Sequence, residues 1–354
     1  MRARLEVLIL AGGEGTRLWP LSRRNFPKPL LPVAAGASPL QRAVSLARSL
    51  AGRGHVWIVG ERTLARRARR HLGPRSGVRL ILEPAPRNTA AALALGAATL
   101  RRRVGAEWLL CLPADQWIRK PRTFGRVVRR VLERGSDRSL VTFGLRPSYA
   151  TTGYGYIEMG ASAGAGLRVA RRFVEKPPAR AARRYVRAGR WVWNSGMFLW
   201  RAEDFLAEVY RLMPEVGRAA AGLVAAEPEE RRTALRRWHA LHPVSVDHGI
   251  LERARRVLVA PCDIGWQDLG SWDALAQALP EAPDGTRYAG RYRSLRGGDC
   301  LIYAPDHLTV CLGARGVGLV VTPGAILLFD RAQHQRVREV AGLLRRSPEL
   351  ARYR

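Results

Sequence analysis

The feature that most constrains this chain is residues 5–33, where the pattern of a buried strand runs directly into a charged glycine loop. Leu5 to Ala11 is an apolar run long enough for one buried strand. It stops at GGEGTR, residues 12–17, whose glycines allow positive φ angles and a close approach of the backbone to a ligand. The N–H groups of such a loop can converge on phosphate oxygens. Arg17 adds a planar cation, and Lys28, between two prolines, adds a stiffly held ammonium.

Two common phosphate motifs are excluded. A P-loop needs a Lys-Ser or Lys-Thr pair after its glycines, and none follows here. A dinucleotide fingerprint needs a third glycine, and Leu18 occupies that position. A simple glycine turn after a core strand would explain Gly12 and Gly13 but neither Arg17 nor Lys28. The stretch therefore predicts a phosphate-binding loop of another kind.

After this loop, strand patterns alternate with helical patterns. We expect strands at residues 55–60, 78–82, 107–112 and 139–144, and helices at 39–51, 61–72, 88–104 and 121–134. Such alternation indicates right-handed βαβ units, and hence an α/β fold with a mainly parallel sheet and helices on both faces. Because ligands of such sheets bind at the carboxyl ends of the strands, we expect Gly12, residues 83–89 and Asp115 to converge on one crevice.

The second half of the chain has shorter β segments. Near residue 280 the pattern changes to a series of short strands separated by turn residues. We expect β segments from 153 to 198 around a helix at 179–188, then helices at 202–213, 228–241 and 271–279, and a strand at 257–261. Beyond a linker at 280–285 we expect short strands at 299–303, 308–312, 316–321 and 325–329, and a terminal helix at 332–345. Two domains follow from this pattern, residues 1–280 and a small β-coil domain at 286–354.

The net charge of +31 could indicate a protein that binds nucleic acid. Nearly all of this charge is arginine, spread over several expected helices, which favours solvated basic faces. Nucleic acid is therefore not expected as a main partner. Lys28, Lys120 and Lys176 are the only lysines. Two of them lie in motifs described here, which indicates that those sites need a compact ammonium.

No feature of the sequence indicates a membrane protein. No apolar run approaches the ~20 residues that span a bilayer. The basic start is followed by too short an apolar stretch for a signal peptide, so we expect a cytoplasmic protein. The four cysteines form no CxxC or Cys/His cluster and are expected to be buried thiols.

Asp115 and Asp268 are the candidate metal ligands. Asp115 ends the strand pattern LLCLPAD, and Asp268 lies in GWQDLGSW, just before an expected helix. A carboxylate at a strand end suits Mg²⁺, which takes hard oxygen ligands together with substrate phosphates. Either aspartate alone could instead cap a helix or belong to a loop, so both interpretations stay open from the residues alone.

Together these motifs resemble the signature of sugar-nucleotide pyrophosphorylases, GGxGTRLxPLS followed by PKP. The continuation WPLSR at residues 19–23 is most similar to the mannose-1-phosphate guanylyltransferase branch. The resemblance implies a Rossmann-like, GT-A-like nucleotidyltransferase fold. In that family the LPAD and GWxDxGSW motifs supply two metal carboxylates, so it also implies Mg²⁺ on Asp115 and Asp268.

The resemblance implies further site residues. Those for the nucleotide are Ala11, Gly12, Gly13, Gly15, Thr16, Arg87, Asn88 and Thr89. Asn88 is also expected to cap its helix. Those for the sugar phosphate are Gly153, Glu175, Lys176 and Asn194, from the motifs TTGYGYI, EKP and WNSGMF, with Asp247 as a supporting residue behind them. The implied catalytic residues are Arg17, Lys28 and Lys176.

The reaction implied is GTP plus mannose 1-phosphate giving GDP-mannose and pyrophosphate. A sugar phosphate oxygen attacks the α-phosphorus in line, so no general base is required. Arg17 and Lys28 are expected to hold the β- and γ-phosphates, and Lys176 the attacking phosphate. The same chemistry on another sugar 1-phosphate or nucleotide, and a catalytically silent regulatory subunit, stay open as alternatives. A homodimer is a possible assembly.

Overall fold

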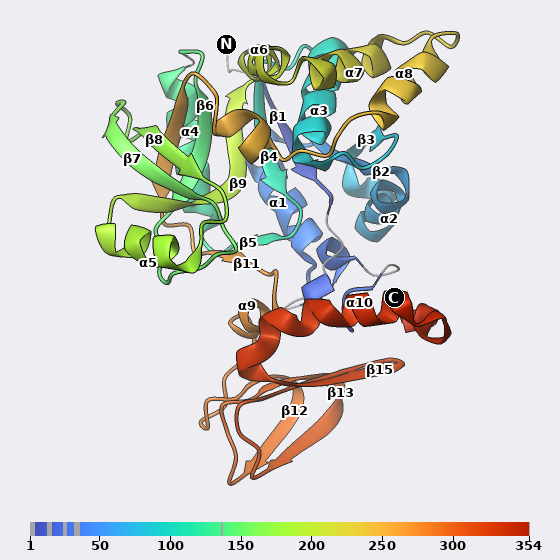
Figure 1. Ribbon diagram of the computed structural model, residues 1–354, viewed down its shortest axis with the longest axis vertical. Helices are drawn as coiled ribbons and strands as arrows, with labels where there is room; N and C mark the ends of the chain where they lie inside the picture. The colour runs from blue at the N-terminus through green and yellow to red at the C-terminus, as the bar shows by residue number, and fades with distance from the viewer. Residues whose placement is uncertain (1–3, 13–15, 24–26, 32–35, 136, 354) are drawn as a thin grey trace. The chain divides into compact units, whose positions relative to one another are not determined.

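The computed structural model describes residues 4–12, 16–23, 27–31, 36–135 and 137–353 (Figure 1). The chain divides into two compact units, of which the first comprises residues 1–12, 43–114 and 118–266, and the second 13–42, 115–117 and 267–354. This division differs from the predicted domains 1–280 and 286–354, which stay a prediction. The second unit includes the segment around Arg17 and Lys28 because Leu18, Trp117 and Trp272 pack in one core. Sequence patterns cannot show such packing between distant segments.

The first unit is built on a nine-stranded sheet with the order β3-β2-β1-β4-β9-β6-β10-β8-β7 (Figure 1). Its strands are β1 (Leu5–Leu10), β2 (Val56–Glu61), β3 (Arg79–Glu83), β4 (Trp108–Pro113), β6 (Leu140–Leu145), β7 (Tyr156–Ser162), β8 (Arg168–Val174), β9 (Trp191–Arg201) and β10 (Val257–Cys262). Strands β3, β2, β1 and β4 are parallel, as predicted. Strand β9 is antiparallel to β4, β6 and β7, and β7 and β8 are also antiparallel. The α/β class is confirmed, and the sheet is mixed because of these strands.

Both faces of this sheet are covered. In β1, Val7 and Ile9 point to one face and Leu8 to the other, and all three are fully buried. On the face of Leu8, Gly96 of α3 leaves room for the leucine side chain. The helices are α1 (Pro39–Ala51), α2 (Arg62–Leu72), α3 (Asn88–Val104), α4 (Pro121–Arg134), α5 (Ala179–Ala188), α6 (Ala202–Leu212), α7 (Pro214–Ala225) and α8 (Arg231–His239). Helix α7 was not expected from the sequence.

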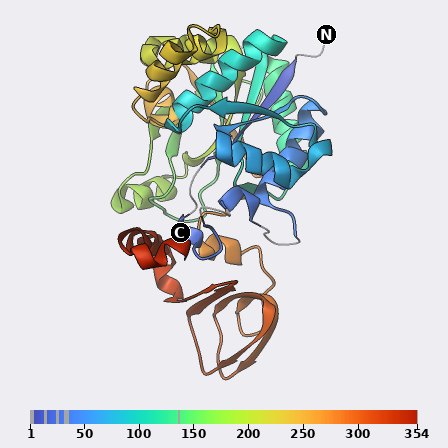
Figure 2. The same cartoon turned by 90° about the vertical axis from the view of Figure 1, so that its right-hand side faces the viewer.

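The second unit contains a four-stranded sheet with the order β12-β13-β14-β15, seen from another side in Figure 2. Its elements are β12 (Arg287–Leu295), β13 (Leu301–Leu312), β14 (Val317–Thr322), β15 (Ala325–Asp330), α9 (Trp272–Ala276) and α10 (Arg338–Arg346). Strands β12, β13 and β14 are parallel, and β15 is antiparallel to β14. The strands expected at 299–303 and 308–312 form a single strand, β13. Strand β12 was not predicted, because its arginines interrupt the apolar pattern of a strand. Strands β5 (Gln116–Ile118) and β11 (Trp266–Asp268) form a separate pair.

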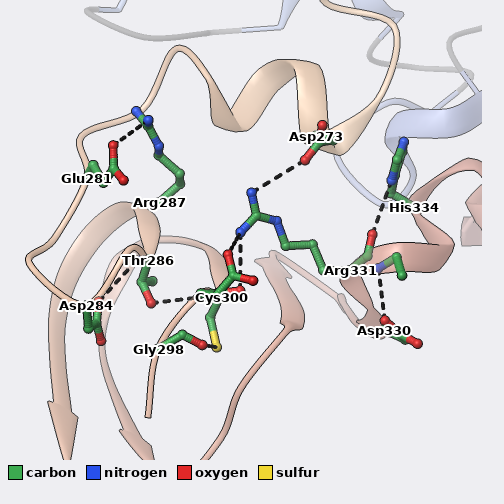
Figure 3. Close-up of polar contacts among 12 residues, drawn as sticks. Asp273, Glu281, Asp284, Thr286, Arg287, Gly298, Cys300, Asp330, Arg331 and His334 are labelled. Atoms are coloured by element: carbon green, nitrogen blue, oxygen red, sulfur yellow. Dashed lines mark hydrogen bonds and ion pairs between the residues drawn. The ribbon is translucent and has the colours of Figure 1, made fainter. Parts of the chain in front are cut away.

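Polar contacts tie the turns of the second unit together (Figure 3). Arg331 lies 3.5 Å from a carboxylate oxygen of Asp273 and donates to the carbonyl of Asp299 at 3.2 Å. The hydroxyl of Thr286 accepts from the N–H of Cys300 at 3.1 Å. These bonds hold α9 and the strands of the small sheet in one arrangement.

Three of the four cysteines, Cys111, Cys300 and Cys311, are buried free thiols, as predicted, and Cys262 is a half-buried free thiol. In the part of the chain that the structure describes, no helix is both long and apolar enough to cross a membrane.

Candidate active site

Lys28, Asp115 and Asp268 form one cluster within the second unit. Lys28 opens a short 3₁₀ turn, Lys28–Leu30, after Pro27. Its Nζ donates to Asp115 Oδ2 at 2.6 Å and to Asp268 Oδ1 at 3.0 Å. The lysine side chain is only 7% exposed. The two predicted metal ligands therefore already share one cation.

Neither aspartate caps a helix. Asp115 lies between β4 and β5, and α4 begins only at Pro121. Helix α9 is capped by Ser271, whose hydroxyl accepts from the N–H of Ala274 at 3.3 Å. The structure therefore removes the capping alternative for both aspartates.

The charge of Lys28 is strongly held. Burial on its own would lower the pKa of Lys28, but the charges of Asp115 and Asp268, with the hydrogen bonds to them, outweigh burial and raise that pKa above its ordinary value. The ammonium therefore remains charged and compensates two carboxylates that would otherwise repel each other.

Arg17 reaches the same cluster beside Gly270. A Cβ on Gly270 would stand 2.8 Å from Asp268 Oδ2 and 3.0 Å from Arg17 Nη2. Both side-chain ends thus occupy space that only a glycine leaves open. The structure brings together four residues that the sequence predicts for phosphate and metal binding, and it adds Gly270, which the sequence reasoning missed.

The cluster fits a divalent cation. Proteins commonly bind Mg²⁺ through one or two carboxylates, and water and substrate phosphates supply the other ligands. Asp115 and Asp268 are close enough for one ammonium to bridge them, which suits such a site. Among the residues described, no group of three or more His, Cys, Asp or Glu side chains could hold a metal. A metal here would therefore have two protein carboxylates and open positions.

Several predicted nucleotide residues lie at the carboxyl ends of β1 and β3. Gly12 is exposed two residues after β1, and Ala11 donates its N–H to Val59 at 3.0 Å. Gly13, Gly15 and the side chain of Thr16 lie outside the described residues. Those predictions therefore stay predictions.

The segment Arg87 to Thr89 is strongly engaged with protein groups. Arg87 donates to the carbonyl of Trp238 at 3.3 Å and to that of His239, at the end of α8. The Thr89 hydroxyl accepts from the N–H of Val246 at 2.8 Å. These contacts give both residues structural roles, and contact with a nucleotide stays a prediction.

Asn88 does not occupy the expected capping position. It is the first residue of α3, with φ of 64°, and its exposed side chain accepts from the N–H of Thr89 at 2.8 Å. Asparagine tolerates this left-handed conformation better than most residues. The helix begins at the expected residue, but the N-cap position belongs to Arg87, which makes no side-chain capping bond.

Glu83, at the end of β3, is a buried carboxyl that the sequence reasoning did not assign. It is 8% exposed, and its Oε1 has no hydrogen-bond partner among the described residues. Burial, and after it the charge of Glu61, raise the pKa of Glu83 to about 7, although the N–H of Arg87 donates to this carboxyl. A buried carboxyl with a pKa raised in this way is a candidate functional group.

The Glu83→Gln variant is expected to be more stable than the parent at pH 8 but not at pH 4. The folded-state pKa of Glu83 lies above the unfolded value, so ionisation of Glu83 lowers stability as pH rises from about 4.5 to about 7. The gain at pH 8 should be on the order of 2–3 kcal/mol at most. Thermal unfolding of both proteins at the two pH values checks this. Equal differences in melting temperature at both pH values would contradict it.

The predicted sugar residues gather in the first unit. Lys176 Nζ lies 3.1 Å from Glu175 Oε1. Asn194 Nδ2 donates to Asp247 Oδ1 at 2.8 Å. The charges of Glu175 and Lys176 both act on Asp247. Four side chains from three separate segments of the sequence therefore lie near one another, and their contact with a sugar phosphate stays a prediction.

Aromatic rings stand beside this cluster. The ring of Tyr154 lies 5.2 Å from that of Trp193 and 5.3 Å from that of Trp266. Gly153, in the same turn, donates its N–H to the Thr151 hydroxyl at 3.1 Å. That bond occupies the group that Gly153 was expected to offer to a sugar. The aromatic rings were visible in the motifs but carried no assigned role.

The chain thus carries two carboxylates joined by a lysine in its second unit, and the residues predicted for the sugar in its first unit, which has an α/β fold. Comparison with known proteins agrees with it: the profile of the family described as nucleotidyl transferase matches residues 6–285. The chain therefore belongs to the nucleotidyl transferase family.

Within this family the chain is similar to mannose-1-phosphate guanylyltransferases. It is 34% identical over 350 residues to the mannose-1-phosphate guanylyltransferase of Escherichia coli (strain K12), covering 96% of this chain and 73% of the relative. It is 35% identical over 345 residues to the xanthan biosynthesis protein XanB of Xanthomonas campestris pv. campestris (strain B100), with coverages of 96% and 73%. A solved structure from Thermus thermophilus, described as a mannose-1-phosphate geranyltransferase, is 32% identical, with a TM-score of 0.88 and coverages of 97% and 99%.

Proposed function

We propose that this chain is an enzyme that transfers a guanylyl group from GTP to mannose 1-phosphate, giving GDP-mannose and pyrophosphate. The similarity to proteins of that name over 96% of the chain supports the substrates. The observation that carries the proposal is the cluster in which Lys28 joins Asp115 and Asp268, because a silent subunit has no need to retain it.

The chemistry needs positioning and charge neutralisation more than proton transfer. A sugar phosphate is anionic at pH 7, so its oxygen can attack the α-phosphorus of GTP without a general base. Lys176, whose side chain is 65% exposed, can meet the attacking phosphate. Arg17 offers a planar fork of donors to the phosphates that leave as pyrophosphate.

Asp115 and Asp268 would hold Mg²⁺. When bound, the metal supplies positive charge to the phosphate oxygens that gain negative charge in the transition state. Arg17 and Lys28 add fixed positive charge on the protein side, so the cluster can neutralise both the carboxylates and the phosphates.

Glu83 supports guanine as the base. Guanine presents N–H donors on its pairing edge, and Oε1 of Glu83, which has no hydrogen-bond partner among the described residues, is an acceptor for one of them. Glu83 ends β3 just before the segment that the resemblance places against the base. Thymine and uracil have a single N–H between two carbonyls, and a carboxylate would repel those oxygens.

Two further proposals follow from the resemblance. We expect the protein to act in the cytoplasm, where GTP and sugar phosphates are made, and to form a homodimer.

Exposed apolar side chains on the small sheet favour self-association. Among them, the side chains of Leu308, Leu312 and Leu328 are 62, 75 and 69% exposed. Light scattering of the purified chain would measure the assembly.

The experiment that tests the function is pyrophosphate release with Mg²⁺, crossing four nucleoside triphosphates with mannose 1-phosphate and glucose 1-phosphate. We expect release with GTP and mannose 1-phosphate at least tenfold above every other pair. Release with another pair would keep the mechanism and change the substrates. Release with none, including a wider panel of sugar phosphates, would favour the silent regulatory subunit.

A further inference from the structure

The amide of Asn194 is held in one orientation. Its Oδ1 accepts from the Thr142 hydroxyl at 2.9 Å and from the N–H of Gly196 at 3.3 Å. A backbone N–H can only donate, so the oxygen and nitrogen of this amide cannot be exchanged. Its Nδ2 donates to Asp247 Oδ1 at 2.8 Å. Both acceptor directions of Asn194 are therefore used, and it can offer a sugar hydroxyl only an N–H.

Hydroxyl groups of a sugar also need acceptors, and two carboxylates are present. Glu175 has a side chain 10% exposed, and its own N–H donates to Glu252 Oε1 at 3.2 Å. A Cβ on Gly155 would collide with Glu175 Oε2, so the glycine at this position leaves the space that the carboxylate fills. Asp247, which is half-buried, is the second carboxylate.

We propose that Asp247 binds the sugar directly, as a second hydroxyl acceptor beside Glu175, and does not serve only to hold Asn194. This inference rests on the proposed function, since its ligand is the sugar 1-phosphate of that reaction. A neutral acceptor would suffice to hold the amide of Asn194. A second carboxylate near Glu175 adds repulsion and desolvation, and two neighbouring hydroxyl donors of a hexose would relieve both.

The charged surroundings of Asp247 agree with such a role. Burial first, and then the charge of Glu175, raise the pKa of Asp247 to about 6, against the opposing effects of the Asn194 hydrogen bond and the Lys176 charge. His248 and Glu252, on the same segment, lie 3.2 Å apart and pair with each other. On the neighbouring helix α6, Glu208 accepts from Arg211 at 3.1 Å. Asp247 is therefore expected to lose its charge as the pH falls through about 6, above the usual range of an aspartate.

The test is a double-mutant cycle between the protein and the sugar. The kcat/KM for the sugar phosphate is measured for the parent and the Asp247→Asn variant with mannose 1-phosphate and with its 2-deoxy, 3-deoxy and 4-deoxy analogues. With the full sugar, Asp247→Asn should lower kcat/KM about 10- to 100-fold, because a hydrogen bond to a charged group is lost. With one of the deoxy sugars the same substitution should cost less than threefold. Thermal unfolding confirms that the variant folds.

The matched control is Thr142→Val, which loosens the other side of the Asn194 amide without touching Asp247. If Asp247 only positions Asn194, both variants will couple to the same hydroxyl, or Asp247→Asn will lower kcat/KM equally with all four sugars. Either result overturns the inference. Coupling of Asp247→Asn alone to one hydroxyl supports it.

A pH profile gives a second readout. Between pH 5 and 7 the parent's kcat/KM should rise more steeply than that of Asp247→Asn. The second ionisation of a phosphate monoester, near pH 6, contributes equally to both proteins and cancels in the comparison. Parallel profiles would count against direct binding by the carboxylate.

Failure of the proposed function can be told apart from failure of this inference. Calorimetric titration of mannose 1-phosphate into the parent and the variant is run beside the turnover assay. A parent that releases pyrophosphate while the cycle shows no coupling overturns only the role of Asp247. A parent that neither binds nor converts mannose 1-phosphate overturns both.

Discussion

Asp115→Asn is expected to lower kcat by about 10²- to 10⁴-fold, and Asp268→Asn by a similar factor. Each substitution removes one of two carboxylates proposed for Mg²⁺, and several kcal/mol of transition-state stabilisation go with the metal's charge. The KM for mannose 1-phosphate should change much less, because the residues proposed to bind the sugar belong to the other unit. Pyrophosphate release at saturating GTP and increasing Mg²⁺ measures the effect.

The control for this prediction is Asp263→Asn. Asp263 also accepts from a lysine, Lys120, at 2.5 Å, but its side chain is 79% exposed. An exposed pair of this kind contributes little, so turnover and stability should stay near the parent values. Near-normal turnover of Asp115→Asn at ordinary Mg²⁺ would make the metal assignment wrong.

Several helices could be predicted closely because the residues that start and end a helix lie within the helix or next to it in the sequence. Helices α1, α3, α4 and α5 begin and end at the expected residues. Each has a proline, asparagine or glycine signal close to its ends and an apolar face between them. Helix α7 has no such contrast, since its alanines and glycines give a weak periodicity.

The candidate site was only partly predictable, for reasons of packing. The aspartates and Lys28 lie in recognisable motifs, yet only the fold shows that one ammonium bridges both carboxylates. The roles of Gly155 and Gly270 depend on side chains that approach from distant segments. Such roles leave no signal at the glycine itself, so a single sequence could not reveal them.

Asp247 shows the same limit from another side. Its motif suggested a supporting residue, and the chain order gave no sign that it would face Asn194, 53 residues earlier in the sequence. Arg87 is the opposite case. Its motif suggested contact with a nucleotide, and the structure holds it on the last carbonyls of α8.

The second large effect is expected for Lys28→Met, which should change metal binding and turnover in opposite directions. In the structure the Lys28 ammonium bridges Asp115 and Asp268, so it competes with any divalent cation for the same two oxygens. Without the lysine, the two carboxylates repel each other and gain more from a cation. The dissociation constant for Mn²⁺, measured by electron paramagnetic resonance without substrates, should fall about tenfold or more.

Turnover of the same variant should nevertheless drop by about 10²- to 10³-fold. The variant lacks a fixed positive charge that would act on the departing phosphates. In a site shielded from water such a charge typically stabilises the transition state by about 3–4 kcal/mol. A more tightly bound metal would not replace that charge, because the substitution removes one cation from the cluster and adds none. Single-turnover measurements at saturating Mn²⁺ separate the loss in the chemical step from any change in metal occupancy.

Lys120→Met is the matched control, since Lys120 pairs with the exposed Asp263. It should leave both the Mn²⁺ dissociation constant and turnover within twofold of the parent, as expected for a surface pair. The interpretation rests on the opposite signs of the two effects of Lys28→Met. Weaker Mn²⁺ binding by this variant would mean that Lys28 supports the carboxylate site and does not compete for it. Unchanged turnover would remove Lys28 from the phosphate-binding residues, and the fixed positive charge proposed for catalysis would then have to come from Arg17 and Lys176.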